Sequence, residues 1–451
     1  FLLVCIIYLP VYIFKRKFHT DFGVRFGKIP KDLDLGRPIW VHAVSVGEAM
    51  SIRELVAELR QEFPALRFVV STVTPTGNNI AKSFARQQDF VTYLPFDLSF
   101  IVNKVIRRIN PKVFIIVETE LWPNLIRCFF KNKIPIVVVN CRISDSSFGG
   151  YKAFKFIFKP LLKKISLFCC QSKQDALRLE MIGADKNKIR VTGNMKFDLK
   201  VANTSFGGSI LKLGDNEELL VAGSTHPGEE EIILRIYKDL RKAHPELRLL
   251  IAPRRPERSD QICRIVRDAG FYPQLISNFC HCEEAEGRLL RLSSLRGAFY
   301  ATKQSQRQAR NRLRNPNSEI ASAPAVPRND SDSVFILDTI GKLVSFYAIA
   351  DIVFMGGTMI KKGGHNIIEP AALGKPVIFG PHMFNFRDIA AQFVQSNCAI
   401  LAHDENELEE KLSFLLDNPE SATELGRRAQ ALVISNRGAT HRNIESIKSV
   451  L

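Results

Sequence analysis

The fold is decided by residues 39–73, IWVHAVSVGEAMSIRELVAELRQEFPALRFVVSTV. Two apolar runs, IWVHAVSV at 39–46 and RFVVSTV at 67–73, flank the amphipathic stretch Ile52–Glu62. Short apolar runs are typical of buried strands, and apolar residues at helical spacing are typical of a surface helix. Strands joined through a helix are parallel, and helices cover both faces of their sheet. This stretch therefore predicts an α/β fold.

The same alternation runs along the chain to about residue 415. In the first half, the strand-like runs KVFIIVE at 112–118 and IPIVVVN at 134–140 flank the helical stretch Leu121–Lys131. Residues 201–217 are polar and contain glycine, which predicts a linker, and strand-like runs such as LRLLIAP and KPVIFG follow it. We therefore expect two α/β domains, one at 18–200 and one at 218–417.

The 451 residues have an ordinary apolar share of 46%, which excludes a disordered or rod-like protein. The 63 Lys and Arg against 46 Asp and Glu leave a net charge of +17, which indicates an anionic partner: nucleic acid, anionic lipid or a phosphorylated substrate. Residues 288–328 hold eight Arg and one Lys against the single acid Glu319, without strand periodicity. They predict a basic insertion at about 283–333, either a solvated loop or a segment drawn to an anionic membrane.

Residues 1–14, FLLVCIIYLPVYIF, carry no charge and are followed at once by Lys15, Arg16 and Lys17. A membrane span needs about 20 residues. Positive charge after the apolar run favours an uncleaved anchor over 1–17, with the rest of the chain in the cytoplasm. A buried first helix is the alternative. The nine cysteines are scattered, as reduced core cysteines are, and no second ligand pair at zinc spacing accompanies the Cys-His-Cys run at 280–282.

Ligands of doubly wound sheets bind at the carboxyl ends of the strands, so the residues after each strand are the candidates. Glu48 follows the first strand in SVGE and is either a partner of the helix dipole or a general base. Glu118 closes an apolar strand, where an unpaired carboxylate is costly, and Arg142 follows the next strand as a candidate partner. Lys196 in GNMKFD is either a ligand of a phosphate or carboxylate, or an ordinary surface lysine.

Glycine-rich turns follow the strands of the second half in the same way. GSTHPGE at 223–229 offers backbone N–H groups to an anion, and Arg254 can grip a phosphate. In GGHNIIEP at 363–370, Asn366 suits a helix cap and Glu369 is placed to bind ribose hydroxyls. The pattern predicts a nucleotide site, and the absence of GxGxxG disfavours a redox dinucleotide. Residues expected to support the site are Ser224, Thr225, His226, Gly357, Gly364 and His365.

Several motifs carry a family resemblance, in this order along the chain: SVGE, TPTG, ETELWPN, GNMKFD, GSTHPGEE, APRRPER, DTIGKL and GGHNIIEPAALGKPVIFGPHMFNFRD. They resemble the 3-deoxy-D-manno-octulosonic acid (Kdo) transferases of lipid A, and the resemblance covers the chain apart from the insertion. The insertion, and Lys342 where the family more often has Glu, resemble the chlamydial branch, whose members add several Kdo units.

The resemblance implies a glycosyltransferase-B fold: two Rossmann-like domains, an N-terminal membrane-anchor helix, and C-terminal helices at 418–451 that pack back on the first domain. It implies inverting transfer, without metal or cofactor, from CMP-Kdo to the lipid A precursor (lipid IVA) at the cytoplasmic side of the bacterial inner membrane. Glu48 is then the proton acceptor, and Glu118 and Lys196 stabilise the transition state. The implied CMP contacts are Pro253, Arg254, Ile340, Gly341, Lys342, Asn366, Ile367, Ile368 and Glu369.

Two other classes of function compete with this one. A different nucleotide-sugar transferase, or an epimerase of the same fold, would use another nucleotide such as UDP, and an epimerase would need no anchor. A basic membrane- or RNA-binding protein would show no turnover. The partners expected from the favoured function are CMP-Kdo, the lipid A precursor and inner-membrane lipid, and not nucleic acid.

Overall fold

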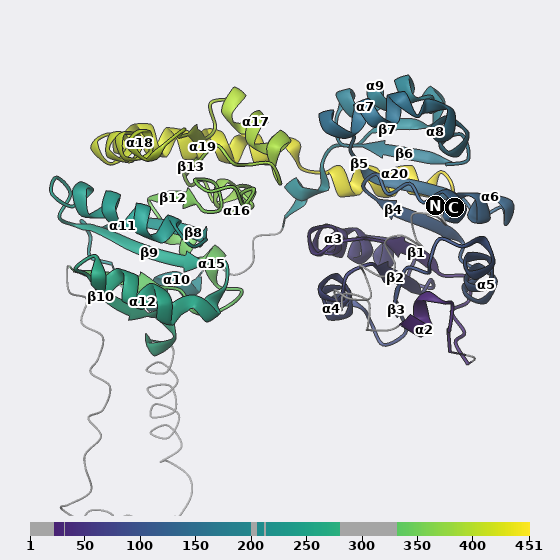
Figure 1. Ribbon diagram of the computed structural model, residues 1–451, viewed down its shortest axis with the longest axis horizontal. Helices are drawn as coiled ribbons and strands as arrows, with labels where there is room; N and C mark the ends of the chain where they lie inside the picture. The colour runs from purple at the N-terminus through teal and green to yellow at the C-terminus, as the bar shows by residue number, and fades with distance from the viewer. Residues whose placement is uncertain (1–21, 31, 200–204, 212, 280–331) are drawn as a thin grey trace, which may run out of the picture. The chain divides into compact units, whose positions relative to one another are not determined.

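The computed structural model describes residues 22–451 except 31, 200–204, 212 and 280–331, and these residues form two compact units (Figure 1). The first unit contains the chain up to Leu199 together with Asn436–Leu451, and the second contains Lys200–Ser435. The predicted anchor and all but the last two residues of the predicted insertion lie outside the described residues. Among the residues that are described, no helix combines the length and the apolar character of a membrane span.

The first unit is built on seven parallel strands in the order β3-β2-β1-β4-β5-β6-β7. The strands are β1 (Ile39–His42), β2 (Phe68–Thr72), β3 (Phe90–Tyr93), β4 (Val113–Val117), β5 (Ile136–Cys141), β6 (Leu167–Cys170) and β7 (Ile189–Val191). The central strands β1, β2, β4 and β5 are buried along their whole length. Burial on both faces explains why the sequence has continuous apolar runs there rather than alternation.

Helices cover both faces of this sheet (Figure 1). They are α2 (Phe22–Arg25), α3 (Val46–Glu62), α4 (Pro75–Phe84), α5 (Ser99–Ile109), α6 (Pro123–Lys131), α7 (Asp145–Ala153), α8 (Lys155–Leu162), α9 (Lys173–Ile182), α20 (Ala439–Lys448) and the short 3-10 helices η1 (Lys186–Lys188) and η2 (Met195–Asp198). One core packs α3 and α20 on the strands, with Leu55 and Ile444 among its members. The other packs α5 and α6, with Val105 and Phe129.

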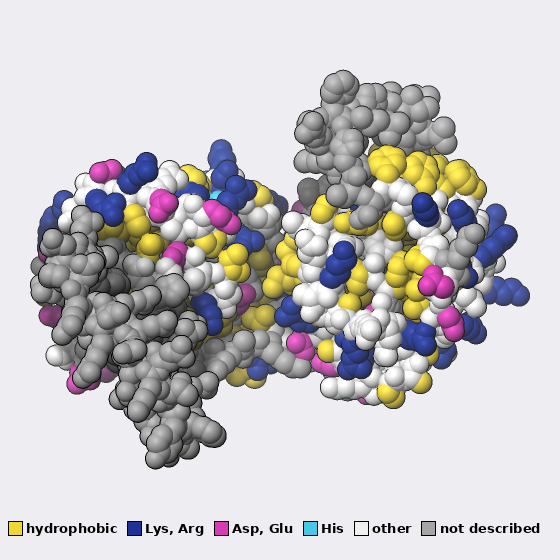
Figure 2. Space-filling model, turned by 90° about the horizontal axis from the view of Figure 1, so that it is seen from below, with side chains coloured by type: hydrophobic (Ala, Val, Ile, Leu, Met, Phe, Trp, Pro, Cys, Tyr) yellow, Lys and Arg dark blue, Asp and Glu magenta, His cyan; other side chains and the backbone are white. Residues whose placement is uncertain are grey.

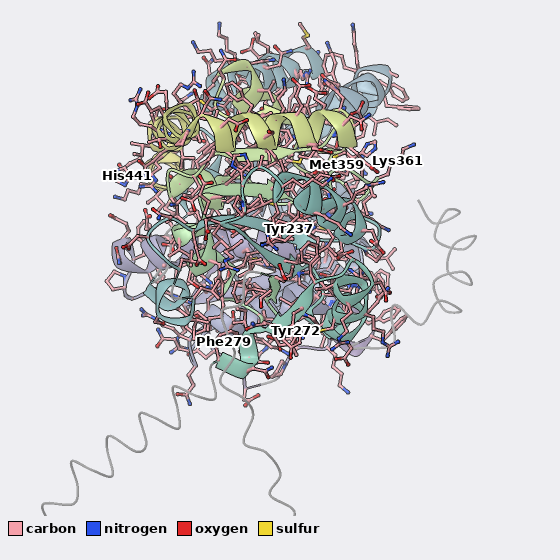
Figure 3. All side chains as sticks on the ribbon, turned by 90° about the vertical axis from the view of Figure 1, so that its left-hand side faces the viewer. Tyr237, Tyr272, Phe279, Met359, Lys361 and His441 are labelled. Carbon is pink, nitrogen blue, oxygen red and sulfur yellow. The ribbon has the colours of Figure 1, made fainter. Side chains whose placement is uncertain are left out.

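The second unit repeats this plan with the parallel order β10-β11-β9-β8-β12-β13-β14. Its strands are β8 (Glu218–Thr225), β9 (Leu247–Pro253), β10 (Tyr272–Leu275), β11 (Ser333–Ile336), β12 (Ile352–Met355), β13 (Val377–Phe379) and β14 (Ile400–Leu401). Its helices are α10 (Ser205–Ile210), α11 (Glu229–Leu240), η3 (Pro256–Arg258), α12 (Ser259–Asp268), α15 (Leu343–Ile349), α16 (Ile368–Ala372), α17 (Arg387–Gln395), α18 (Glu405–Asp417) and α19 (Pro419–Asn436). Tyr237 of α11 is buried against the sheet, whereas Tyr272 is exposed on the edge strand β10 (Figure 3).

Three predicted boundaries differ from the structure. The expected linker at 201–217 contains α10, which packs on α15 through Phe206 and Phe346, whose rings lie 6.0 Å apart. Of the C-terminal helices, α20 packs on the first unit, but α19 up to Ser435 belongs to the second, where Leu425 joins the core. Helix α3 begins at Val46, well before Ile52, because Ser45 caps it.

The basic charge of the chain is not confined to the predicted insertion. Lys and Arg side chains are spread over the surface of each unit in the view of Figure 2. Some of them pair with acids, as Arg258 does with Glu230 at 2.9 Å.

Each sheet has one point at which the strand order reverses, which is where ligands of such sheets bind. In the first unit the reversal lies between β1 and β4, and in the second between β8 and β12. The residues that follow these four strands are therefore the ones to examine for function. In the first unit they include Glu48 and Glu118, and in the second His226 and Gly357.

Candidate functional site

Glu48 lies in the first turn of α3, at the switch point of the first sheet. The Ser45 hydroxyl caps this helix by accepting the Glu48 N–H at 3.4 Å, and it donates to Glu48 Oε1 at 2.8 Å. Glu48 Oε2 accepts the Val44 N–H at 2.8 Å. The Glu48 side chain thus turns back toward the end of the strand, as in a capping box. The residue is nearly buried, with an exposed fraction of 8%.

Three carboxylates meet at the ends of β1 and β4. Burial raises the pKa of Glu48; the hydrogen bonds from Val44 and Ser45 oppose the rise, and the carboxylates of Glu118 and Glu120 add to it. Burial also raises the pKa of Glu120, with a further contribution from Glu118. A carboxylate with a raised pKa is a stronger proton acceptor than an ordinary one. The geometry therefore suits Glu48 to general-base chemistry as well as to capping.

Glu118 follows β4 directly and has φ at +59°. This left-handed conformation costs a non-glycine residue about 1–2 kcal/mol, and such strained residues gather at functional sites. Its Oε1 lies 3.8 Å from Lys196 Nζ, with both side chains partly exposed. The structure therefore places Lys196, rather than only the expected candidate Arg142, next to Glu118, and joins one negative and one positive group.

Lys196 lies on η2, and buried polar contacts hold this segment in place. Asn140, fully buried at the end of β5, accepts the Met195 N–H through Oδ1 at 3.0 Å. Asp198 accepts the N–H groups of Gly438, at 2.6 Å, and Thr440, where α20 begins. The C-terminal helix thus fastens one end of η2 and Asn140 the other, which fixes the backbone that carries Lys196.

In the second unit, a buried carboxylate joins the two loops of the switch point. Glu229, the first residue of α11, is fully buried and accepts four backbone N–H groups. His226 N–H donates to Oε2 at 3.0 Å and Gly357 N–H to the same oxygen at 2.6 Å. The N–H groups of Thr358 and Met359 donate to Oε1 at 2.9 and 3.0 Å. Burial raises the pKa of Glu229, and the four donors oppose the rise.

His226 and His365, one from each of these loops, form a stacked pair. Their rings are parallel with centroids 5.2 Å apart, and His226 Nε2 lies 2.9 Å from His365 Nε2. Burial lowers the pKa of both, to about 4 for His365, so both are neutral at pH 7 and one donates to the other. Gly357 has φ at +71°, and a Cβ on it would lie 3.2 Å from the His365 ring. Glycine is therefore required where this backbone meets the histidine pair.

Arg254, Asn366 and Glu369 lie close to this pair. The N–H of Arg254 donates to the Thr225 carbonyl at 2.9 Å. Burial lowers the pKa of His365, and the charge of the exposed Arg254 side chain lowers it further. Burial raises the pKa of Glu369, and the hydrogen bond from Asn366 and the charge of Arg254 oppose the rise. Asn366 Nδ2 donates to Glu369 Oε1 at 3.1 Å, and its Oδ1 accepts the Ile368 N–H at 3.2 Å. The N-cap of α16 is Ile367 rather than Asn366, although the Asn366 side chain still accepts an N–H of this helix.

The predicted turn Ile340–Gly341–Lys342 follows β11, at the same edge of the sheet. Ile340 is 81% exposed, and Gly341 has φ at +84°. The Lys342 ammonium lies 4.2 Å above the centre of the Phe206 ring. The Lys342 side chain thus lies against α10.

Other predicted residues have supporting positions. Ser224 has φ at +60°, Pro253 is buried at the end of β9, and Gly364 donates its N–H to the Gly357 carbonyl at 2.8 Å. Thr225 donates its hydroxyl to Glu230 at 2.9 Å. Across the part of the chain that the structure describes, no three His, Cys, Asp or Glu side chains are grouped so as to hold a metal ion.

Sequence reasoning missed the residues that hold these sites together. Glu229 stands in the quoted motif GSTHPGEE, but neither its four N–H partners nor the contacts of Asn140 and Asp198 could be derived from sequence spacing. A signal was present for Glu229, since a carboxylate in the first turn of a helix after a glycine-rich strand end is well placed to collect N–H groups.

Comparisons with known proteins agree with this architecture. Residues 20–199 match the family described as 3-Deoxy-D-manno-octulosonic-acid transferase (kdotransferase), and residues 325–432 match Glycosyl transferases group 1. A 3-deoxy-D-manno-octulosonic acid transferase from Haemophilus influenzae is 33% identical over 92% of this chain and 87% of the relative. One from Chlamydophila psittaci is 28% identical over 98% of this chain and 92% of the relative.

Among solved structures, a UDP-GlcNAc 2-epimerase from Neisseria meningitidis bound to UDP-GlcNAc superposes with a TM-score of 0.57. The match covers 91% of this chain and all of the other, at 12% identity. At that identity the likeness establishes a shared fold of two Rossmann-like units. With the glycosyl transferase match in the second unit, the fold is the expected glycosyltransferase-B fold.

Proposed function

The chain belongs to the 3-deoxy-D-manno-octulosonic acid (Kdo) transferase family, a family of glycosyltransferases, and on that premise we propose that it moves Kdo from CMP-Kdo to the lipid A precursor. The observation that carries the proposal is Glu48, a buried carboxylate with a raised pKa at the switch point of the first sheet. A group transfer to a hydroxyl needs a proton acceptor of this kind.

In the proposed step, a hydroxyl oxygen of the acceptor attacks the anomeric carbon of Kdo and gives its proton to Glu48. The bond from that carbon to the phosphate oxygen breaks, CMP leaves with the electron pair, and the anomeric centre inverts. Lys196 offsets negative charge on the sugar carboxylate or the departing phosphate, and Glu118 favours positive charge on the sugar ring. The pair at 3.8 Å supports these complementary roles.

The second unit supplies the CMP site of the proposal. Arg254 binds the phosphate, since a guanidinium can offer it two hydrogen bonds. Glu369, held by Asn366, accepts from ribose hydroxyls. The exposed turn at 340–342 contributes through its backbone, because the Lys342 side chain lies over Phe206.

The acceptor and the location are further parts of the proposal. The acceptor is lipid IVA, a phosphorylated and acylated disaccharide, at the cytoplasmic side of the bacterial inner membrane, where residues 1–17 act as the anchor. The apolar run followed by Lys15, Arg16 and Lys17 supports this orientation. The basic insertion and Lys342 support more than one Kdo unit for each acceptor, as in the chlamydial branch.

Mass spectrometry of the product tests the proposal most directly. Purified chain is incubated with lipid IVA and with CMP-Kdo made in situ, and the lipid is expected to gain the mass of one or more Kdo units. An unchanged lipid would contradict the proposal.

An epimerase is the second candidate because of the fold it shares with the Neisseria enzyme. Calorimetric titration with CMP and UDP separates the two functions, since a Kdo transferase should bind CMP in preference. A clear preference for UDP would favour the epimerase.

A further inference from the structure

Lys362 lies on a loop that begins and ends at the switch point of the second sheet. The loop runs from Gly357, just after β12, to Gly364, and the Gly364 N–H donates to the Gly357 carbonyl at 2.8 Å. Gly363 and Gly364 have φ at +95° and +71°, which lets the backbone turn back directly after Lys362. The lysine is exposed, so its side chain is not part of the core.

A turn after β13 holds the backbone at Lys362 in place. The Asn385 N–H donates to the Gly363 carbonyl at 3.0 Å, and Asn385 Nδ2 donates to the Lys362 carbonyl at 3.1 Å. A Cβ on Gly363 would clash with the Asn385 amide and with the Phe384 ring, so glycine is required there. The lysine is therefore carried by a fixed backbone, as a side chain that binds a ligand should be.

The positive charge of Lys362 acts on the histidine pair. Burial lowers the pKa of His226, and the charge of Lys362 lowers it further, with a larger effect than the charge of Arg254. The ammonium group is therefore close to His226. Among the residues that the structure describes, no acid forms an ion pair with Lys362. A cation beside two neutral rings, without an acidic partner, is available to an anionic group of a ligand.

A second cation approaches the same pair from the other side of the switch point. In the second sheet β9 and β12 flank β8, the strand whose following loop carries His226. Arg254 follows β9, and Lys362 follows β12. Arg258, which also follows β9, is already paired with Glu230 at 2.9 Å. The site therefore has cations on both sides of β8, with Arg254 on one side and Lys362 on the other.

A CMP-Kdo donor carries two negative groups, the phosphate that links the nucleoside to the sugar and the carboxylate of the sugar. Arg254 is the proposed partner of the phosphate. We propose that the Lys362 ammonium group binds the sugar carboxylate through charge-assisted hydrogen bonds. The assignment rests on the proposed function and adds to it a residue that selects an acid sugar.

Other ligands of such a site differ in this one group. A nucleotide linked to a neutral sugar has no carboxylate and would leave the ammonium group without a counter-charge. Free CMP lacks the sugar altogether, so its binding should depend little on Lys362. A comparison of CMP with CMP-Kdo therefore isolates the contribution of the carboxylate.

Binding of CMP and of freshly made CMP-Kdo, measured by calorimetry without acceptor, tests the assignment. For Lys362→Ala we expect the dissociation constant of CMP-Kdo to rise about tenfold or more, because a charge-assisted hydrogen bond is lost. The dissociation constant of CMP should change less than about threefold. Lys362→Arg keeps the charge and should recover most of the affinity for CMP-Kdo. In transfer to lipid IVA, Lys362→Ala should raise KM for the donor and leave kcat unchanged.

The matched control is Lys361→Ala, which removes the neighbouring exposed lysine and should bind both ligands as the wild type does. Equal losses of affinity for CMP and CMP-Kdo in Lys362→Ala would overturn the assignment, because the ammonium group would then belong to the nucleotide. Unchanged affinity for CMP-Kdo would overturn it as well.

The proposed function can fail separately from this assignment. A wild type that binds CMP-Kdo through Lys362 but transfers no Kdo would keep the carboxylate site and contradict the transferase activity. A wild type that transfers Kdo, with a Lys362→Ala variant that binds the donor normally, would keep the activity and contradict the site. A wild type without affinity for CMP-Kdo would contradict both.

Discussion

Glu48 and Glu229 occupy matching places in the two units and have different surroundings. Each lies in the first turn of the helix that follows the strand at the switch point of its sheet. Glu48 accepts two hydrogen bonds, and 8% of the residue is exposed. Glu229 accepts four and is fully buried.

The difference separates a reactive carboxylate from a structural one. A carboxylate has about four acceptor positions. Those of Glu229 are all taken by backbone N–H groups, so it cannot accept a proton without losing a donor. Half of those of Glu48 are free. Burial raises the pKa of both carboxylates, and for Glu48 the charges of Glu118 and Glu120 add to the rise. We therefore expect the first unit to carry the chemistry and the second to carry binding.

The largest effect is expected from Glu48→Gln. The amide keeps the shape of the side chain but cannot take a proton, so kcat should fall by about 10²–10⁴-fold. CMP affinity, measured by calorimetry, should stay at the wild-type value because CMP is bound by the second unit. The control is Glu62→Gln at the other end of α3, which should leave both quantities unchanged. A correctly folded Glu48→Gln enzyme with normal kcat would remove Glu48 as the base.

Glu229→Gln should act on stability instead. An amide accepts only through its oxygen, so two of the four N–H groups would face an NH₂ group and lose their acceptor. At about 1–3 kcal/mol for each unsatisfied group, the free energy of unfolding should fall on the order of 3 kcal/mol. Thermal unfolding measures this loss, and CMP affinity should fall with it because Gly357 is no longer held.

The neighbouring Glu231→Gln serves as control, since Glu231 is exposed on the same helix. A Glu229→Gln chain with wild-type stability and CMP affinity would show that the four hydrogen bonds do not hold the binding loops. The difference between a reactive Glu48 and a structural Glu229 would then no longer hold.

The fold and part of the site could be predicted from the sequence, but the contacts that complete the site could not. Buried parallel strands leave continuous apolar runs, so the architecture and the location of Glu48 at a strand end could be predicted. The pairing of Lys196 with Glu118 could not, because it depends on η2 being fastened by Asn140 and by the start of α20, far away in the sequence. The helix α10 was missed because its polar, glycine-containing sequence hides two packing residues, Phe206 and Ile210.

A smaller effect is expected on the pH dependence of transfer. Glu48 works in its deprotonated form, so kcat/KM should fall as the pH falls through its raised pKa. The negative charge of Glu118 contributes to that raised pKa. Glu118→Gln removes the charge, lowers the pKa of Glu48 and should move the acid limb of the profile to lower pH, whatever its effect on the maximal rate. An acid limb that stays in place or moves to higher pH would mean that a group other than Glu48 controls it.

The smallest effect is expected from Lys342→Ala, at the edge of the CMP site. The ammonium lies over the Phe206 ring, a contact of about 0.5–1 kcal/mol at an exposed position, so the change should slightly lower the melting temperature. If the turn binds CMP through its backbone, the dissociation constant for CMP should change less than about threefold, which is under 1 kcal/mol. Phe206→Leu removes the same contact from the other partner and should reproduce the small loss of stability. A tenfold loss of CMP affinity in Lys342→Ala, without such a loss in Phe206→Leu, would instead show that the ammonium group binds the nucleotide. The second unit would then bind CMP through the Lys342 side chain as well as through the backbone of the turn.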